Sequence, residues 1–329
     1  MTIRHSGGQY EVYFGTLAEA VAALPLHRRI VTDENVENAL GVAADIVLPA
    51  GEKTKSLEAY AEAAGRLARS RATRKTTLVA LGGGVIGDLT GFLAASYMRG
   101  VPFVQIPTSL LAMVDSSVGG KVGIDLPEGK NLLGAFYPPV EVRIPLDALD
   151  TLPQAQVANG MAEVWKTGFI RDEPLVARLE KDPTPDRALI ERCVVHKAAV
   201  VEADEYETNG LRATLNYGHT IGHAIERVQG YEGFLHGEAI SVGMVLEARL
   251  GERIGATEPG TAERVRCGLA SQGLPTEWAV PDPDDLIEAM RGDKKAEAGR
   301  LAFALLDRVG SCRLWPNVPE AEVRAVLEG

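Results

Sequence analysis

Short apolar runs alternate with stretches of helical spacing over the first half of the chain. The apolar runs predict strands near residues 10–14, 29–31, 45–48, 77–81, 103–106 and 142–144. Between two of them, apolar positions recur every three or four residues through 57–69, which predicts an amphipathic helix. Strands and helices in alternation indicate a Rossmann-like, mainly parallel sheet covered by helices.

The second half of the chain has helical spacing almost throughout. The predicted helices cover 153–167, 186–202, 220–228, 237–254, 261–271 and 284–291. Proline and glycine fall between them, and a short strand pair is predicted near 301–305 and 311–314. We therefore predict an α/β protein with an α/β domain at 1–150 and a mostly α-helical domain at 151–329, and we expect the ligand site in the cleft between them.

Composition narrows the class of protein. The 329 residues are 46% hydrophobic and 24% charged, as in folded globular domains. A formal net charge of −11 argues against nonspecific nucleic-acid binding, which needs a basic surface. The longest uncharged segment, residues 100–114, is too short to span a membrane, and the first residues lack the apolar core of a signal peptide. Three scattered cysteines indicate neither disulfides nor a cysteine zinc site, so we expect a cytoplasmic protein.

A glycine-rich turn follows the predicted strand at 77–81. Gly82, Gly83 and Gly84 precede a helical pattern that contains Asp88. Glycine lets the backbone approach a phosphate, and the first N–H groups of a helix attract anions. The segment indicates a pyrophosphate site, although it lacks the usual dinucleotide spacing and a tight turn without ligand is the alternative.

Charged residues recur in the glycine-rich segment from 99 to 131. We place Lys121 and Lys130 in loops, where their cations suit a phosphate or a carboxylate. Asp115 lies among apolar residues and needs a partner if it is buried. Surface charge for the lysines and a structural ion pair for Asp115 are the alternatives.

Three of the six histidines fall between positions 219 and 236. His219 and His223 are four residues apart, so on a helix they share a face, and His236 follows a glycine-containing turn. Imidazole and carboxylate groups bind zinc, and the candidate carboxylates are Glu163, Glu226 and Glu238. Spacing alone does not decide which of them bind, and histidines hydrogen-bonded in a core are the alternative.

Together these segments resemble the 3-dehydroquinate synthases of the sugar-phosphate cyclase family, over about residues 32–305. The resemblance is carried by TDEN at 32–35, GEKTK at 51–55, GGGVIGD at 82–88, RG at 99–100, PTSLLAMVDSSVGGKVGIDLPEGKN at 107–131, GMAEVWK at 160–166, LNYGHTIGHAIE at 215–226, HGE at 236–238 and DKK at 293–295.

The resemblance implies NAD and a divalent metal, normally Zn2+ with Co2+ as an alternative. It makes Glu163, His219 and His236 the metal ligands. The implied NAD contacts are Asp33, Asn35, Glu52, Lys55, Gly83, Gly84, Val85, Asp88, Thr108, Ser109, Lys121 and Lys130. The implied catalytic residues are Asp115, Lys121, Lys166, Lys197, Asn216 and His223, and the implied substrate-binding residues are Arg99, Lys130, Asn131, Arg212 and Lys295.

The resemblance also implies roles for these groups. Asp115 and Lys166 would hold substrate hydroxyls and metal-bound oxygens, His223 and Lys121 would lie near the phosphate, and Lys197 and Arg212 near the carboxylate. In the family, an arginine that matches Arg99 reaches the neighbouring subunit's substrate, which implies a homodimer. Asn209 looks like an extra residue between Glu207 and Arg212, so the role of Glu207 stays open.

The implied reaction converts 3-deoxy-D-arabino-heptulosonate 7-phosphate into 3-dehydroquinate and phosphate, a lyase step of the shikimate pathway to aromatic amino acids. It proceeds by transient oxidation with NAD, β-elimination of phosphate, re-reduction and intramolecular aldol closure. Two alternatives stay open. One is another sugar-phosphate cyclase that makes an amino-dehydroquinate or a cyclitol, and the other is a metal-dependent polyol or glycerol dehydrogenase.

Overall fold

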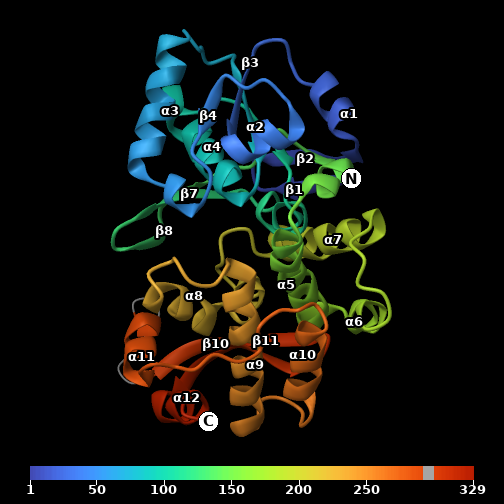
Figure 1. Ribbon diagram of the computed structural model, residues 1–329, viewed down its shortest axis with the longest axis vertical. Helices are drawn as coiled ribbons and strands as arrows, with labels where there is room; N and C mark the ends of the chain where they lie inside the picture. The colour runs from blue at the N-terminus through green and yellow to red at the C-terminus, as the bar shows by residue number, and fades with distance from the viewer. Residues whose placement is uncertain (292–299) are drawn as a thin grey trace. The chain divides into compact units, whose positions relative to one another are not determined.

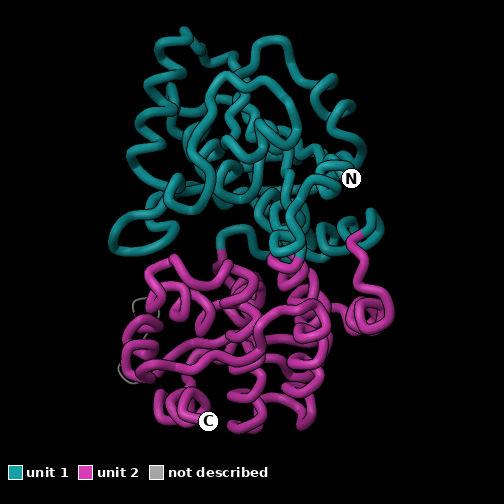
Figure 2. The backbone as a smooth tube through the Cα atoms, in the orientation of Figure 1, with its two compact units in different colours: residues 1–157, 186–206 teal, residues 158–185, 207–329 magenta. Residues whose placement is uncertain are grey.

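The computed structural model describes residues 1–291 and 300–329, which form two compact units (Figure 2). Unit 1 consists of residues 1–157 and 186–206, and unit 2 of residues 158–185 and 207–329. The domain boundary predicted near residue 150 stays a prediction.

Unit 1 is built on a seven-stranded sheet in the order β1-β2-β9-β6-β5-β3-β4 (Figure 1). β1 pairs antiparallel with β2, and all other neighbours pair in parallel. The strands are β1 (Thr2–His5), β2 (Gly8–Gly15), β3 (Arg28–Asp33), β4 (Ile46–Leu48), β5 (Thr77–Gly82), β6 (Phe103–Pro107) and β9 (Glu141–Pro145). Each of the six strands predicted in this half overlaps one of them, which confirms the mainly parallel α/β sheet.

Helices pack against this sheet because parallel strands need crossover connections that return over its faces. They are α1 (Leu17–Ala22), α2 (Glu34–Leu40), α3 (Leu57–Arg69) and α4 (Gly84–Ser96), with short turns η1 (Glu52–Thr54), η2 (Tyr97–Arg99), η3 (Ala112–Ser116) and η4 (Leu146–Thr151). The helix predicted at 57–69 is confirmed with the same bounds. Every residue of β5 is buried, so β5 and the apolar helix α4 that follows it form the centre of the unit.

A β-hairpin replaces the loops predicted around Lys121 and Lys130. Lys121 begins β7 (Lys121–Leu126), and Lys130 lies in β8 (Gly129–Phe136), which pairs antiparallel with β7. Gly123 and Gly134 lie opposite each other, and a Cβ atom on either would come within 2.7 Å of the other strand's backbone. Gly123 and Gly134 therefore allow the two strands to approach closely.

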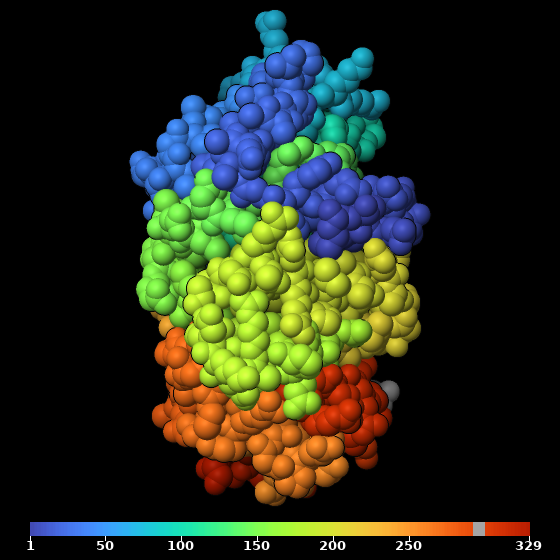
Figure 3. Space-filling model, turned by 90° about the vertical axis from the view of Figure 1, so that its right-hand side faces the viewer, coloured from blue at the N-terminus to red at the C-terminus, as the bar shows by residue number. Residues whose placement is uncertain are grey.

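Helix α7 (Arg187–Ala203) belongs to unit 1, although it comes after the first part of unit 2 in the chain. The backbone N–H of Arg4 donates to Glu202 at 2.8 Å, and that of Ser6 donates to Glu205 at 2.6 Å. Figure 3 shows these dark-blue N-terminal residues beside the yellow segment at the end of α7.

Unit 2 is mostly helical, as predicted for the second half of the chain. Its helices are α5 (Gln154–Arg171, which begins in unit 1), α6 (Glu173–Leu179), α8 (His219–Val228), α9 (His236–Arg253), α10 (Thr261–Ala270), α11 (Pro283–Arg291) and α12 (Glu320–Leu327), with the turn η5 (Arg212–Asn216). The strand pair β10 (Arg300–Arg308) and β11 (Ser311–Pro319) is also confirmed. Because α9 packs against α8, α10, α12 and β10, it is largely buried along its length. No helix in the described ranges is both long and apolar enough to cross a membrane.

Candidate active site

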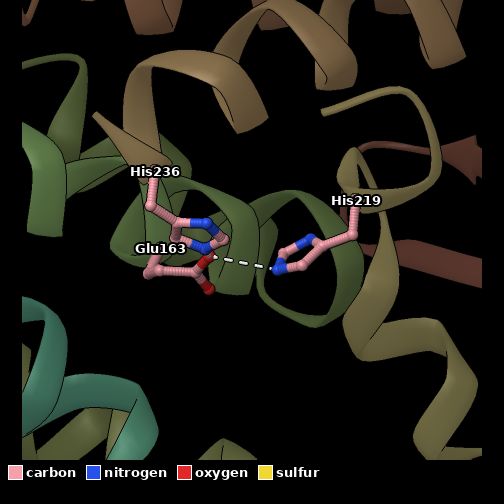
Figure 4. Close-up of side chains that lie close together, drawn as sticks. All are labelled: Glu163, His219 and His236. Atoms are coloured by element: carbon pink, nitrogen blue, oxygen red, sulfur yellow. Dashed lines mark ion pairs between the residues drawn. The ribbon is translucent and has the colours of Figure 1, made fainter. Parts of the chain in front are cut away.

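Three possible metal ligands from different helices meet in unit 2 (Figure 4). Glu163 lies in α5, whereas His219 and His236 are the first residues of α8 and α9. Oε1 of Glu163 is 3.5 Å from Nε2 of His219 and 3.7 Å from Nε2 of His236. Two ligand atoms each about 2.1 Å from a tetrahedral zinc ion would be about 3.4 Å apart. The spacing therefore fits a divalent metal.

The surroundings of Glu163 also fit a cation. Both of its carboxylate oxygens are buried, and they face the basic side chains of Lys166, His219 and His236. The ammonium group of Lys166, one turn further along α5, forms an ion pair with Glu163. Burial raises the pKa of Glu163, but Lys166 and His236 outweigh that effect and hold the pKa at about 2. Glu163 is thus an ionised, buried carboxylate.

The two histidines differ in protonation. Burial, Lys166 and the two neighbouring histidines lower the pKa of His219 well below its usual value. Burial also lowers the pKa of His236, but Glu163 and Glu226 raise it to about 9. A metal ion at this cluster would therefore displace a proton from His236.

A further group fixes the ring of each histidine. Nδ1 of His219 lies 3.1 Å from the carbonyl oxygen of Tyr217, and Nδ1 of His236 lies 3.4 Å from Oε1 of Glu226. Both contacts leave Nε2 facing Glu163, which is the arrangement typical of histidine metal ligands.

Sequence spacing did not decide which histidines and carboxylates bind a metal, and the structure brings them together in two overlapping sets. Glu163, His219 and His236 form one set of possible metal-binding atoms, and His223, Glu226 and His236 form a second, with all atoms of a set within 4.8 Å of one another. The ring of His223 is 5.2 Å from that of His219. Glu238, the third candidate carboxylate, instead accepts the N–H of Leu235 at 2.7 Å at the beginning of α9.

Two other residues of unit 2 that are expected to contact the substrate, Arg212 and Asn216, differ in exposure. Arg212 is buried in η5, whereas Asn216 at the end of that turn is exposed. Lys295 lies outside the described residues. Glu207, whose role the sequence left open, has a positive φ of 58° in the turn that precedes η5.

The predicted pyrophosphate turn lies at the beginning of α4. No side chain caps this helix at its N-cap residue, Gly83. A Cβ atom on Gly83 would lie 3.3 Å from Oγ of Ser109, and one on Gly84 would lie 3.2 Å from Oγ of Ser116. Glycine at both positions keeps the backbone N–H groups accessible to an anion, so the turn fits the phosphates of NAD.

The remaining expected NAD residues lie around this turn or at neighbouring strand ends. Thr108 is buried after β6, and its N–H donates to the carbonyl of Gly82 at 3.0 Å, while Val85 lies in the first turn of α4. Asp33 ends β3 and caps α2 by accepting the N–H of Val36 at 3.0 Å, and Asn35 is exposed.

The buried side chain of Lys55 contacts two other residues of the expected NAD and substrate sites. Nζ of Lys55 is 2.5 Å from Oδ2 of Asp88 and also contacts Oδ1 of Asn131. Burial lowers the pKa of Lys55, but Asp88 and Glu52 outweigh that effect and raise it. Nζ of Lys130 lies 3.3 Å from Oε1 of Glu52. The residues from η1, α4 and β8 thus meet at one place in unit 1.

Asp115 and Lys197 form a pair across 82 residues of sequence. Nζ of Lys197, in α7, is 2.7 Å from Oδ1 of Asp115 and 2.6 Å from its backbone carbonyl. Asp115 lies in η3, a π-helical turn of a kind often found at functional sites. Lys121 and Arg99 are exposed, and Met98, Arg99 and Gly100 have φ values of 51°, 70° and 117°. Such strained backbone is concentrated at functional sites.

Sequence reasoning missed Asn159, which lies one turn before Glu163 in α5. Its Oδ1 accepts the N–H of Gly237 at 2.5 Å, next to His236, although the side chain belongs to a different helix. Its position four residues before Glu163, on the same side of the predicted helix, was the available signal.

Comparison with known proteins shows the family to which the chain belongs. The models for the N-terminal and C-terminal regions of 3-dehydroquinate synthase match residues 45–159 and 160–296. The 3-dehydroquinate synthase of Acidithiobacillus ferrooxidans is 46% identical over 291 residues, which are 86% of this chain and 80% of that protein.

Two solved structures have a similar fold. That of 2-deoxy-scyllo-inosose synthase complexed with carbaglucose-6-phosphate, NAD+ and Co2+ is 27% identical, with a TM-score of 0.85 over 100% of this chain and 99% of the other. That of the 2-epi-5-epi-valiolone synthase of Streptomyces hygroscopicus, with NAD+ and Zn2+ bound, is 26% identical, with a TM-score of 0.87 over 97% and 96%. From the matches along its sequence, this chain belongs to the 3-dehydroquinate synthase family.

Proposed function

We propose that this protein is a 3-dehydroquinate synthase, which converts 3-deoxy-D-arabino-heptulosonate 7-phosphate into 3-dehydroquinate and phosphate. The observation that carries the proposal is the Glu163, His219 and His236 cluster in a chain of this family. We also propose a cytoplasmic location, in keeping with cysteines that form no disulfide among the described residues.

Glu163, His219 and His236 would hold a divalent metal, for which we propose Zn2+ with Co2+ as the alternative. Such an ion polarises the hydroxyl and carbonyl oxygens that it binds. Lys166 keeps Glu163 ionised and, being buried beside it, would donate to a substrate oxygen at the same place.

NAD would be held in unit 1, with its pyrophosphate at the beginning of α4 and with Lys55 and Asp88 among the residues that hold it. When bound, NAD supplies an acceptor that takes up a hydride and returns it. The Lys55 and Asp88 pair is almost neutral overall, so it would orient polar groups of the cofactor without attracting a second anion.

The substrate carries a phosphate and a carboxylate, and both suit lysine and arginine. We propose that Lys121 and His223 lie near the phosphate and that Lys197 and Arg212 lie near the carboxylate. Asp115, held by Lys197, would accept a hydrogen bond from a substrate hydroxyl and so fix its orientation.

The test is to measure phosphate release with Zn2+ and a catalytic trace of NAD, while absorbance follows NADH. Many phosphates released per NAD without net NADH, abolished by a chelator and by Glu163→Gln, would support the proposal. Accumulation of NADH with a polyol would favour a dehydrogenase. Turnover of only an amino or cyclitol precursor would indicate another sugar-phosphate cyclase. The two cyclases of known structure have a lower sequence identity to this chain, 27% and 26%, than the 3-dehydroquinate synthase of Acidithiobacillus ferrooxidans, at 46%.

We further propose a homodimer in which Arg99 reaches the substrate of the second copy, because its side chain is exposed on a strained turn. Arg99→Ala and Glu163→Gln would each be inactive alone. After mixing and subunit exchange, one site of each heterodimer has both wild-type residues, so about a quarter of wild-type activity should return. No recovery from subunits shown to exchange would refute the shared site.

A further inference from the structure

Helices α8 and α9 carry two of the three proposed metal ligands, and they cross in close contact. A Cβ atom on Gly218, the residue before α8, would lie 2.4 Å from Cγ of Met244 in α9. One on Gly222 would lie 2.6 Å from Cδ1 of Ile240. Each glycine directly precedes a histidine of α8, so one side of the helix approaches α9 while the adjacent side carries His219 and His223.

This close approach brings a buried carboxylate of α9 to the beginning of α8. Glu247 has no exposed surface, and its Oε2 accepts the N–H of Gly218 at 2.6 Å while Oε1 accepts that of Ile221 at 3.2 Å. α8 has no side-chain cap at its own N-cap residue, because Gly218 occupies it with φ 81°. Glu247 therefore takes the place of a local N-cap.

His219 lies between the two amides that Glu247 binds. The residue before them is also attached to α9, because the hydroxyl of buried Tyr217 donates to the carbonyl of Met244 at 2.7 Å. The carbonyl of the same tyrosine contacts Nδ1 of His219. The backbone on both sides of His219 and the rotation of its ring thus depend on the same helix.

We propose that Glu247 is a positioning residue for the metal centre, which holds His219 where it and His236 bind the same ion. The inference rests on the proposed function. Removing partners behind a ligand typically costs about 10- to 100-fold in metal affinity, and we expect a loss of that size without Glu247.

The chain offers a matched control on the same helix. α10 also begins after a glycine with positive φ, Gly260, and lacks a local side-chain cap. Oε1 of Glu252, five residues after Glu247 in α9, accepts the N–H of Ala262 at 2.8 Å. Glu252 therefore performs the same capping for a helix that carries no proposed ligand.

The experiment compares Glu247→Gln with Glu252→Gln in the full chain. The two oxygens of Glu247 accept the N–H groups of Gly218 and Ile221. Glutamine has only one oxygen, so in either orientation of its amide the NH2 group faces one of these two N–H donors. The dissociation constants of Zn2+ and Co2+ are measured by competition with a chelator, and the visible spectrum of bound Co2+ reports its ligand geometry. Thermal unfolding of the metal-free proteins gives the loss of stability.

We expect Glu247→Gln to weaken metal binding about 10- to 100-fold and to alter the Co2+ spectrum. Glu252→Gln should leave both unchanged, because its carbonyl oxygen can still accept the one N–H of Ala262. Unchanged binding and spectrum in Glu247→Gln, or equal losses in both variants, would overturn the inference. If Glu247→Gln does not fold, Tyr217→Phe tests the same attachment, and wild-type metal affinity in that variant would overturn it. Absence of metal binding in the wild-type protein would instead refute the proposed function.

Discussion

Replacing Gly243 by alanine should separate α8 from α9 and weaken the metal site. A Cβ atom at this position would lie 2.1 Å from the carbonyl oxygen of Gly218 and 2.9 Å from the backbone nitrogen of Gly222. Both neighbours are backbone atoms, which cannot rotate away. To restore an ordinary contact of about 3.4 Å, α8 must move by about 1.3 Å, because packed interiors have no spare volume.

The expected magnitudes follow from that displacement. Overpacking costs about 1–3 kcal/mol, partly offset by about 1 kcal/mol gained when alanine replaces a helical glycine. We expect a net loss of up to about 2 kcal/mol and a fall in Tm of up to about 8 °C. His219 moves with α8, and a displacement of about 1 Å far exceeds the roughly 0.2 Å tolerance of a metal site. Metal affinity should therefore fall by about 100-fold or more.

The assay is thermal unfolding with and without Zn2+, together with chelator competition. The matched control is Gly65→Ala in α3, where the nearest atom to the new Cβ is the flexible end of Arg69 at 3.1 Å. That variant should gain up to about 1 kcal/mol and keep wild-type metal affinity. A Gly243→Ala protein with unchanged Tm and metal affinity would refute the close crossing of the two helices.

Three further predictions concern the two units separately. His219→Ala should abolish metal binding and phosphate release, and full metal content in the purified variant would refute its assignment as a ligand. Because the pKa of His236 is raised from 6.5 to about 9, its contribution to the stability of the metal-free protein is complete below pH 6.5 and is lost as the pH rises through about 9. Over this range the affinity for the metal should rise about tenfold per pH unit, and binding at pH 7.5 should release nearly one proton. Calorimetry in two buffers measures this proton release. A metal affinity that does not change with pH would contradict the prediction. Asp88→Asn should leave the buried ammonium group of Lys55 without its carboxylate partner. We expect the free energy of unfolding, measured with denaturant, to fall by about 3 kcal/mol or more and NAD binding to weaken. Wild-type stability in this variant would show that the pair contributes little.

Local sequence patterns were sufficient for most of the fold. The central strands β5 and β6 are buried on both faces, so they appear as short, mostly apolar runs. α3 has one buried face, so its apolar residues recur with helical spacing, and its predicted bounds agree with the structure. Where the pattern reflected contacts between strands, it misled: Lys121 and Lys130 were expected in glycine-rich loops, whereas both lie in a hairpin in which Gly123 faces Gly134.

The sequence by itself determined which residue types are available to the site: a glycine turn before α4, scattered lysines, and histidines with nearby carboxylates. The tertiary structure decided which of them meet. Helical periodicity places His219 and His223 on one side of α8, but only the packing of α5, α8 and α9 brings Glu163 to His219 and leaves Glu226 behind His236. The physical reason is that periodicity fixes neighbours within one or two turns, whereas Asp115 meets Lys197 across 82 residues, and such distant pairs depend on how whole elements pack.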